Sequence, residues 1–232
     1  RQGYSYVEAG DGDELWKNRH FASIRRAHGP VFDLLHRFYG EARLHLLTGN
    51  HDADGAATRD GLPLSEGLVL RRRYSGQELL IMHGHQADFK NDRLGAALRF
   101  FVQHFWRHLQ SRGLRNTLPE ASQLPGAGRL MRQVAQWAQA NQGAIERKLL
   151  GWAQARGQGL ICGHTHRPRF ARAGEPPYFN TGSCIQPGYI TGLEIAHGQI
   201  SLVRWRAQEA PRGAVAYVRE ALSAPRSLAS LA

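Results

Sequence analysis

The sequence predicts an α/β fold, and three observations lead to that prediction. Short apolar runs of strand length recur along the chain, and each is followed by a polar turn that contains glycine. Segments with apolar residues at helical spacing separate several of these runs. At 232 residues the chain is long enough for one sizeable domain with an insertion. Strands that alternate with helices in this way are typical of α/β proteins.

The composition excludes some classes of protein and favours others. With 42% hydrophobic and 21% charged residues the chain has an ordinary globular composition. No run reaches the roughly 18 apolar residues of a membrane span. The net charge is +11, but 27 of the 30 basic residues are arginines scattered along the chain, which favours a solvated surface over a nucleic-acid interface. Two cysteines do not make a disulfide framework, so a reducing, cytoplasmic location is expected.

The first strand is expected over Tyr4–Ala9, and the turn Gly-Asp-Gly-Asp-Glu follows it at 10–14. Gly10 allows a sharp turn at the strand end. Asp13 suits the cap of a following helix, whereas Asp11, nearest the strand end, is assigned to chemistry. Because the chain opens at Arg1 in what reads as the middle of a fold, we expect that a piece precedes it.

The second strand, 44–48, leads into Gly-Asn-His-Asp at 49–52, after helical patterns around Phe21 and over 31–38. An Asx-type turn is the structural explanation of such a cluster, although the histidine fits that explanation less well. Asn50 can offer a carbonyl oxygen to a hard metal ion. His51 can donate a proton, and Asp52 can orient and stabilise its charged imidazole.

The third strand, 79–82, ends in His83-Gly84-His85, and His83 is preferred as a ligand because it lies nearer the strand end. A helical insertion is then expected over about 88–157. It either covers a face of the sheet or overhangs the site as a lid. Its aromatic and arginine content suits an amphipathic substrate that bears phosphate, and equally a peripheral membrane contact.

A further strand over 160–162 runs into Gly-His-Thr-His at 163–166. In an extended backbone residues i and i+2 point the same way, so His164 and His166 are predicted to face one space. An apolar strand that ends in a polar glycine turn follows over 178–184. After it come a β-hairpin over 192–205 and a weak helical pattern over 215–222. Cys162 and Cys184 are expected to be buried strand residues rather than nucleophiles.

Five candidate ligands therefore lie where strands give way to loops: Asp11, Asn50, His83, His164 and His166. Ligands of open α/β sheets bind beyond the carboxyl ends of the strands. Oxygen and nitrogen donors without a thiolate suit divalent Mn, Fe, Co, Ni or Zn. Five donors exceed the needs of one tetrahedral ion, and two ions bridged by Asp11 would use them all.

These motifs, in this order and approximate spacing, resemble the calcineurin-like metallophosphoesterase family over roughly Tyr4 to Trp205. The resemblance implies a four-layer α/β/β/α sandwich with a dinuclear metal centre, most simply manganese. The corresponding domain would span 1–207, with a C-terminal tail at 208–232. The family also has an Asp-x-His motif on an earlier strand. Nothing before Asp11 provides it, so we expect it in a piece upstream.

Roles follow from the resemblance position by position. Asp11 looks like the bridging carboxylate, and His166 like a ligand of the first metal. The second metal's ligands correspond to Asn50, His83 and His164. His51 resembles the family's histidine that steadies the phosphate and protonates the leaving oxygen, with Asp52 behind it. The implied mechanism is in-line attack on phosphorus by a hydroxide that bridges the two metals.

Three functions are compatible with this resemblance. A phosphatase of broad or unknown substrate comes first. A UDP-2,3-diacylglucosamine-type pyrophosphatase of lipid A synthesis comes second, because those enzymes carry a helical insertion at the same place. A protein-binding scaffold on the same fold, such as the retromer subunit that resembles it, is the alternative without catalysis. Intact Asn50 and His51 favour an enzyme, whose partner would be a phosphorylated substrate.

Overall fold

The computed structural model describes residues 3–13, 15, 18, 20–52, 57–73, 75–87, 129–186, 188–209 and 215–231. Over 129–138 it describes side chains only for Gln133 and Gln136. The chain divides into two compact units. Unit 1 comprises 1–70 and 80–113, and unit 2 comprises 71–79 and 114–232. Much of the expected insertion, 88–128, lies outside the described residues, as does Glu14 of the first motif.

Unit 1 contains a four-stranded sheet in the order β1-β2-β4-β3. Strand β1 (Tyr6–Glu8) pairs in parallel with β2 (Leu44–Leu47), which pairs in parallel with β4 (Leu62–Ser65). Strand β3 (Thr58–Arg59) is antiparallel to β4. Parallel neighbours need a crossover, which α1 (Phe21–Ala27) and α2 (Gly29–Gly40) provide between β1 and β2. The predicted α/β character is confirmed in this unit.

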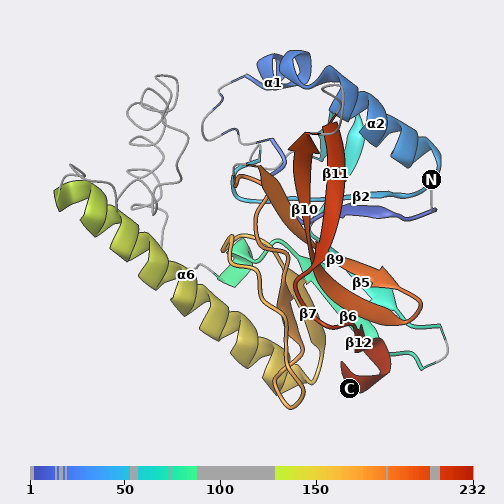
Figure 1. The fold of residues 1–232 in the computed structure, drawn as a ribbon, viewed down its shortest axis with the longest axis vertical. Coiled ribbons are helices and arrows are strands. Elements are labelled where there is room, and N and C mark those ends of the chain that lie inside the picture. Colours follow the sequence, from blue (N-terminus) through green and yellow to red (C-terminus); the bar gives the residue numbers. More distant parts are fainter. Residues whose placement is uncertain are drawn as a thin grey trace. The chain divides into compact units, whose positions relative to one another are not determined.

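Helix α2 and the sheet share a hydrophobic core in unit 1. Phe32 and Leu35 lie one turn apart on α2, and Leu44 and Leu46 alternate on β2, so each element presents one apolar face. Helix α2 packs against β2, and α1 precedes α2 in the chain; Figure 1 draws both helices in blue. Burial of these side chains fixes the strands, and it thereby fixes the places where the polar loops begin. The full cluster is Phe32, Leu35, Leu44, Leu46 and Leu62, with Phe21, Ile24, Phe38 and Leu64 against it.

A second strand pair leads to the third histidine motif. Strand β5 (Gly67–Arg71) neighbours β6 (Glu78–Met82), and Leu79 and Ile81 are the buried residues of β6. The strand ends one residue before His83, as the sequence predicts. A short 3-10 helix, η1 (His85–Ala87), follows.

Beyond residues 71–79, the described part of unit 2 begins with α6 (Arg129–Arg156). The helical insertion expected over about 88–157 thus ends in a single 28-residue helix. Ile145, Leu149 and Ala153 form a buried stripe at i, i+4 and i+8 on this helix. Strand β7 (Gly159–Cys162), buried at all four positions, pairs in parallel with β8 (Tyr178–Asn180).

The predicted hairpin is confirmed as β9 (Tyr189–Ala196) and β10 (Gln199–Glu209). His197 and Gly198 join the strands, both with positive φ, as two-residue hairpin turns require. The helical pattern predicted over 215–222 is wrong. That segment forms β11 (Val215–Ala221), antiparallel to β10, because strand pairing along its length outweighs a weak local period.

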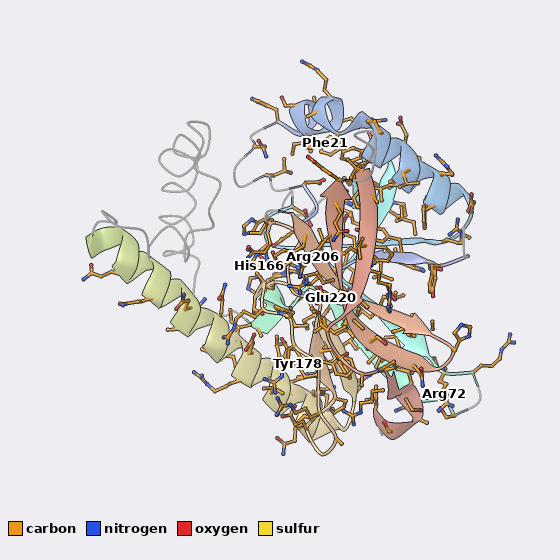
Figure 2. The ribbon with its side chains drawn as sticks, viewed as in Figure 1. Phe21, Arg72, His166, Tyr178, Arg206 and Glu220 are labelled. Carbon is orange, nitrogen blue, oxygen red and sulfur yellow. The ribbon has the colours of Figure 1, made fainter. Side chains whose placement is uncertain are left out.

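The end of the chain is also built into the sheet of unit 2. Figure 2 labels Arg206 on β10 and Glu220 on β11, whose side chains form an ion pair across the two strands. Strand β12 (Arg226–Ser227) pairs with β10 as well, and the 3-10 helix η4 (Leu228–Leu231) follows. Residues 208–232 thus include more regular structure than the word tail implies. The four-layer arrangement needs both units and stays a prediction. Within the described parts of the chain, no helix has the length and apolarity to cross a membrane.

Candidate metal-binding site

The loop after β1 carries the first candidate ligand, Asp11. Gly10 has φ 90° and Asp11 has φ 62°, so two successive residues adopt left-handed conformations. A Cβ at Gly10 would lie 2.5 Å from Nδ1 of His83. Only glycine therefore admits that imidazole so close to the loop. The sharp turn predicted at this strand end is confirmed, and its purpose is to make room for His83.

The loop after β2 is joined to the first loop by carboxylates that accept backbone hydrogen bonds. Asp52 accepts from Gly49 N at 2.7 Å and from Asp11 N at 3.1 Å through Oδ2, and from Asp13 N at 3.3 Å through Oδ1. In return, Asp11 Oδ1 accepts from His51 N at 2.8 Å. A Cβ at Gly49 would overlap the Asp11 carboxylate. The two loops of unit 1 are thus fixed against one another.

Asp52 was predicted to orient the imidazole of His51. The hydrogen bonds described for its buried carboxylate instead go to backbone N–H groups of the two loops. This function of Asp52 had no signal in the sequence, because spacing alone does not show which N–H groups a carboxylate will meet. A role of Asp52 behind His51 stays a prediction.

His83 brings three donor atoms together within unit 1. Its Nδ1 lies 2.6 Å from the carbonyl oxygen of Ala9. A carbonyl only accepts, so Nδ1 carries the hydrogen. The other nitrogen, Nε2, lies 3.0 Å from Asp11 Oδ2 and 3.2 Å from Asn50 Oδ1. Metal-binding histidines commonly donate their second ring N–H to a carbonyl in this way. Asp11, Asn50 and His83 therefore fit a cation placed among Oδ2, Oδ1 and Nε2.

The protonation of the metal-free pair follows from the same contacts. Burial favours the neutral form of His83, but the hydrogen bond and the charge of Asp11 outweigh it and raise the pKa of His83. Burial likewise opposes ionisation of Asp11, yet His83 and His51 hold the pKa of Asp11 well below its usual range. A proton on His83 Nε2 can therefore hydrogen-bond to the side-chain oxygens of Asp11 and Asn50 that a metal ion would otherwise bind. The proton and the metal ion compete for the same position.

His85, the other member of the third motif, lies beside His83 with 5.4 Å between ring centroids. Burial, and then the charge of His83, lower the pKa of His85. The contacts of His83 with Ala9, Asp11 and Asn50 favour His83 as the ligand. That choice remains a prediction until metal binding is measured.

A buried charge cluster that the sequence analysis missed supports the Asp11 loop. Arg59 on β3 has a side chain only 3% exposed, with Nη2 2.5 Å from Glu8 Oε1 and Nε 3.3 Å from Asp13 Oδ1. Burial first, and then nearby carboxylates, raise the pKa of Asp13 to about 6 despite Arg59. A Cβ at Gly12 would collide with Glu8 and Arg59. Only the distant position of Arg59 in the sequence hid this cluster.

Asp13 was expected to cap a helix, and that prediction is wrong. Helix α1 begins at Phe21 and its N-cap residue is His20, which makes no side-chain cap bond. Asp13 instead faces Arg59 in the buried cluster. The carboxylate is therefore ion-paired with a charge from another element and does not interact with a helix dipole, while its Oδ1 has no hydrogen-bond partner among the described residues.

In unit 2 the loop after β7 carries the histidine pair. His164 has φ 62° and His166 has φ 56°, and Thr165 N donates to Gly163 O at 2.7 Å in a tight turn. The extended backbone assumed in the sequence analysis is therefore wrong beyond Cys162, and the alternation rule does not apply to this pair. Of the six non-glycine residues with positive φ in the described part of the chain, three are candidate ligands: Asp11, His164 and His166.

The two cysteines differ. Cys162 is buried at the end of β7, and burial raises the pKa of its thiol. Cys184 is exposed and lies four residues beyond the end of β8, so the prediction that it is a buried strand residue is wrong. The apolar run that suggested a longer strand stops at Asn180.

Comparison with known proteins gives little beyond this geometry. No family model and no curated protein matches the chain. Among solved structures, the chain is similar to Vacuolar Protein Sorting 29 from Cryptosporidium parvum, with a TM-score of 0.41 and 13% identity over 97% of this chain and 84% of that chain. A likeness this weak establishes no family, so the metallophosphoesterase resemblance stays a prediction.

Proposed function

We propose that the chain is a metal-dependent phosphoesterase of the calcineurin-like type. The observation that carries the proposal is the contact of His83 Nε2 with Asp11 Oδ2 at 3.0 Å and with Asn50 Oδ1 at 3.2 Å. An aspartate, an asparagine and a histidine from three separate loops converge with their lone pairs toward one place. Hard oxygen donors beside an imidazole are the set expected for a divalent first-row metal.

Further support comes from the loop that carries His164 and His166. Left-handed backbone at two non-glycine residues is unfavourable, and such residues cluster at functional sites as well as in turns such as the one at His197. In the proposal His164 and His166 would be further ligands of divalent ions, with manganese as the first expectation. Such ions, when bound, neutralise phosphoryl oxygens and lower the pKa of a water molecule.

The chain's own residues then have separate tasks. Asp11, Asn50 and His83 bind the cations, and the Ala9 carbonyl keeps the Nδ1–H tautomer of His83. The backbone N–H of His51 donates a hydrogen bond to Asp11, so His51 lies beside the candidate ligand. This position suits a residue that donates the proton to the leaving oxygen. Asp52 keeps the two loops in register. The substrate would be a phosphate ester.

The test compares metal binding with turnover in the full-length protein. Metal-free protein is titrated with Mn²⁺ by calorimetry, and hydrolysis of an aryl phosphate and of an aryl phosphodiester is followed with and without Mn²⁺. Asp11→Asn and His83→Gln are expected to lower both affinity and turnover by at least roughly 10-fold. His45→Gln is the matched control, because His45 on β2 is exposed. It should behave as wild type.

Each outcome has a meaning for the proposal. Neither binding nor turnover by the wild-type protein would overturn it. Binding without turnover, together with capture of a protein partner, would favour a scaffold. Turnover of a nucleoside-diphosphate-linked lipid such as UDP-2,3-diacylglucosamine, in preference to the simple esters, would assign a pyrophosphatase.

A further inference from the structure

We propose that Asn180, at the end of β8, is the positioning residue that holds the His164–His166 loop in its metal-binding conformation. The inference rests on the proposed function and deepens it, since it names a residue that acts through the loop rather than on the metal. Asn180 is fully buried, although the amide of asparagine is strongly hydrated when exposed. Its burial is therefore favourable only if the amide forms hydrogen bonds within the protein.

The side-chain amide of Asn180 meets four partners within unit 2. Its Nδ2 lies 2.6 Å from Gly163 O, 3.2 Å from Thr165 Oγ1 and 3.2 Å from the Tyr178 hydroxyl. Its Oδ1 accepts from Gly182 N at 2.9 Å. The shortest contact is with the carbonyl that opens the histidine loop, and a further one, at 3.2 Å, is with Thr165 between the two histidines. The amide of Asn180 thus contacts the histidine loop at two residues, Gly163 and Thr165.

Thr165 passes this restraint on to α6. The Thr165 hydroxyl accepts from Asn180 and donates to Glu146 Oε1 at 3.2 Å, and Thr165 is fully buried. The other oxygen of Glu146 lies 3.6 Å from Arg167 Nη1, just after the loop. Figure 2 labels His166 in this loop and Tyr178 at the start of β8, the strand that ends at Asn180.

The network explains how the loop keeps an unfavourable backbone. His164 and His166 have φ 62° and 56°, and such conformations persist only where the surroundings over-determine them. Between them, Thr165 is held from one side by Asn180 and from the other by Glu146. The backbone bond from Thr181 N to Cys162 O, 2.9 Å, fixes the strand ends beside them. Loss of the amide would release the loop while leaving both imidazoles present.

Four variants separate positioning from general stability. Asn180→Asp keeps the shape but cannot donate to Gly163 O. Thr165→Val removes the hydroxyl, and Thr165→Ser restores it. Tyr178→Phe removes a partner of Asn180 that does not belong to the loop. Three measurements follow on each: Co²⁺ affinity by titration of its visible absorption, backbone order parameters of His164 and His166 in metal-free protein, and the thermal midpoint.

Asn180→Asp and Thr165→Val are expected to weaken Co²⁺ binding roughly 10-fold and to lower both order parameters. Thr165→Ser and Tyr178→Phe should remain near wild type in these two readouts. A lower thermal midpoint with unchanged order parameters would overturn the proposal, as would an equal loss in Tyr178→Phe. If Asn180→Asp does not fold, the comparison of Thr165→Val with Thr165→Ser tests the proposal through the same two readouts. Failure of the wild-type protein to bind Co²⁺ would instead count against the proposed function, and the order parameters would still decide the role of Asn180.

Discussion

The backbone N–H of Asp11 donates a hydrogen bond to the Asp52 carboxylate at 3.1 Å, across 41 positions of sequence. The same carboxylate oxygen accepts from Gly49 at 2.7 Å. A carboxylate at the end of one motif therefore sets the position of the ligand in another. The two motifs behave as one structural element, which explains why the glycines beside them have no room for a side chain.

Asp52→Asn tests this link. The amide keeps one acceptor but turns a donor toward a backbone N–H, so a buried donor loses its partner. We expect a loss of about 1–3 kcal/mol in the free energy of unfolding, measured by urea denaturation. Asp33→Asn is the control, because Asp33 is 68% exposed and solvent screens its ion pair with Arg25. Equal losses in both variants would contradict the link.

Gly49→Ala tests the packing of Asp11. The added methyl group would overlap the Asp11 carboxylate, so the loop must shift, at a cost of about 1–3 kcal/mol. Mn²⁺ affinity should fall with it, since the carboxylate is displaced. Gly40→Ala, at the end of helix α2, adds a methyl with no heavy atom within 4 Å, so it should leave Mn²⁺ affinity unchanged and should not lower stability. Wild-type affinity in Gly49→Ala would show that Asp11 is not a ligand.

The free energy of unfolding should change with pH because Asp13 titrates at a different pH in the folded and unfolded states. Its pKa is raised from 3.8 to about 6 in the folded protein, so the folded state holds the proton more tightly than the unfolded chain does. Stability from this group is complete below about pH 4 and is lost as pH rises through 6, by up to roughly 3 kcal/mol. Asp13→Asn cannot ionise, so its urea-derived stability should decline less over this range. Parallel curves for variant and wild type would rule this out.

Arg59→Met leaves two buried carboxylates without their cation. We expect a loss of about 3–5 kcal/mol at neutral pH, and a smaller loss at acid pH where the carboxylates are protonated. The comparison is Arg71→Met, since Arg71 is 71% exposed in its pair with Glu78 and should cost less than about 1 kcal/mol. Denaturation at both pH values measures the difference, and a loss in Arg59→Met that does not change with pH would argue against the buried cluster.

The thiols should react at very different rates. Cys184 is exposed and Cys162 is buried with a raised pKa, so an aromatic disulfide reagent should modify one thiol quickly and the second only on unfolding. Cys184→Ala should remove the fast phase and Cys162→Ala should leave it. A fast phase that survives in Cys184→Ala would place Cys162 at the surface.

The sequence predicts the strands before Asp11, Asn50, His83 and His164 well, because short apolar runs ended by glycine are a local signal. It also predicts the β9–β10 hairpin, because two apolar runs there flank a short turn that contains glycine. The errors share a cause. The segment at 215–222 has a weak helical period, yet pairing with β10, the strand before it in the chain, decides its conformation, and local periodicity does not report strand pairing.

In the candidate site too, the sequence predicts what depends on local signals and misses what depends on contacts between separate elements. The sequence predicts that Asp11, Asn50 and His83 are ligands, and the structure brings the side-chain donor atoms of these three residues together in unit 1. Metal binding by these residues stays a prediction. The sequence does not predict Arg59 or Asn180, whose roles depend on groups at distant positions. It also misjudges the histidine pair, since the assumption of extended backbone ignores the turn formed by Gly163 and Thr165.

The left-handed backbone at Asp11, His164 and His166 limits what can replace them. Asparagine, aspartate, histidine and glycine tolerate that conformation far better than branched or bulky residues. A duplicate of this chain that drifted away from metal binding would therefore be expected to carry asparagine or glycine at these places, and to keep the shape of the loops after their chemistry was gone.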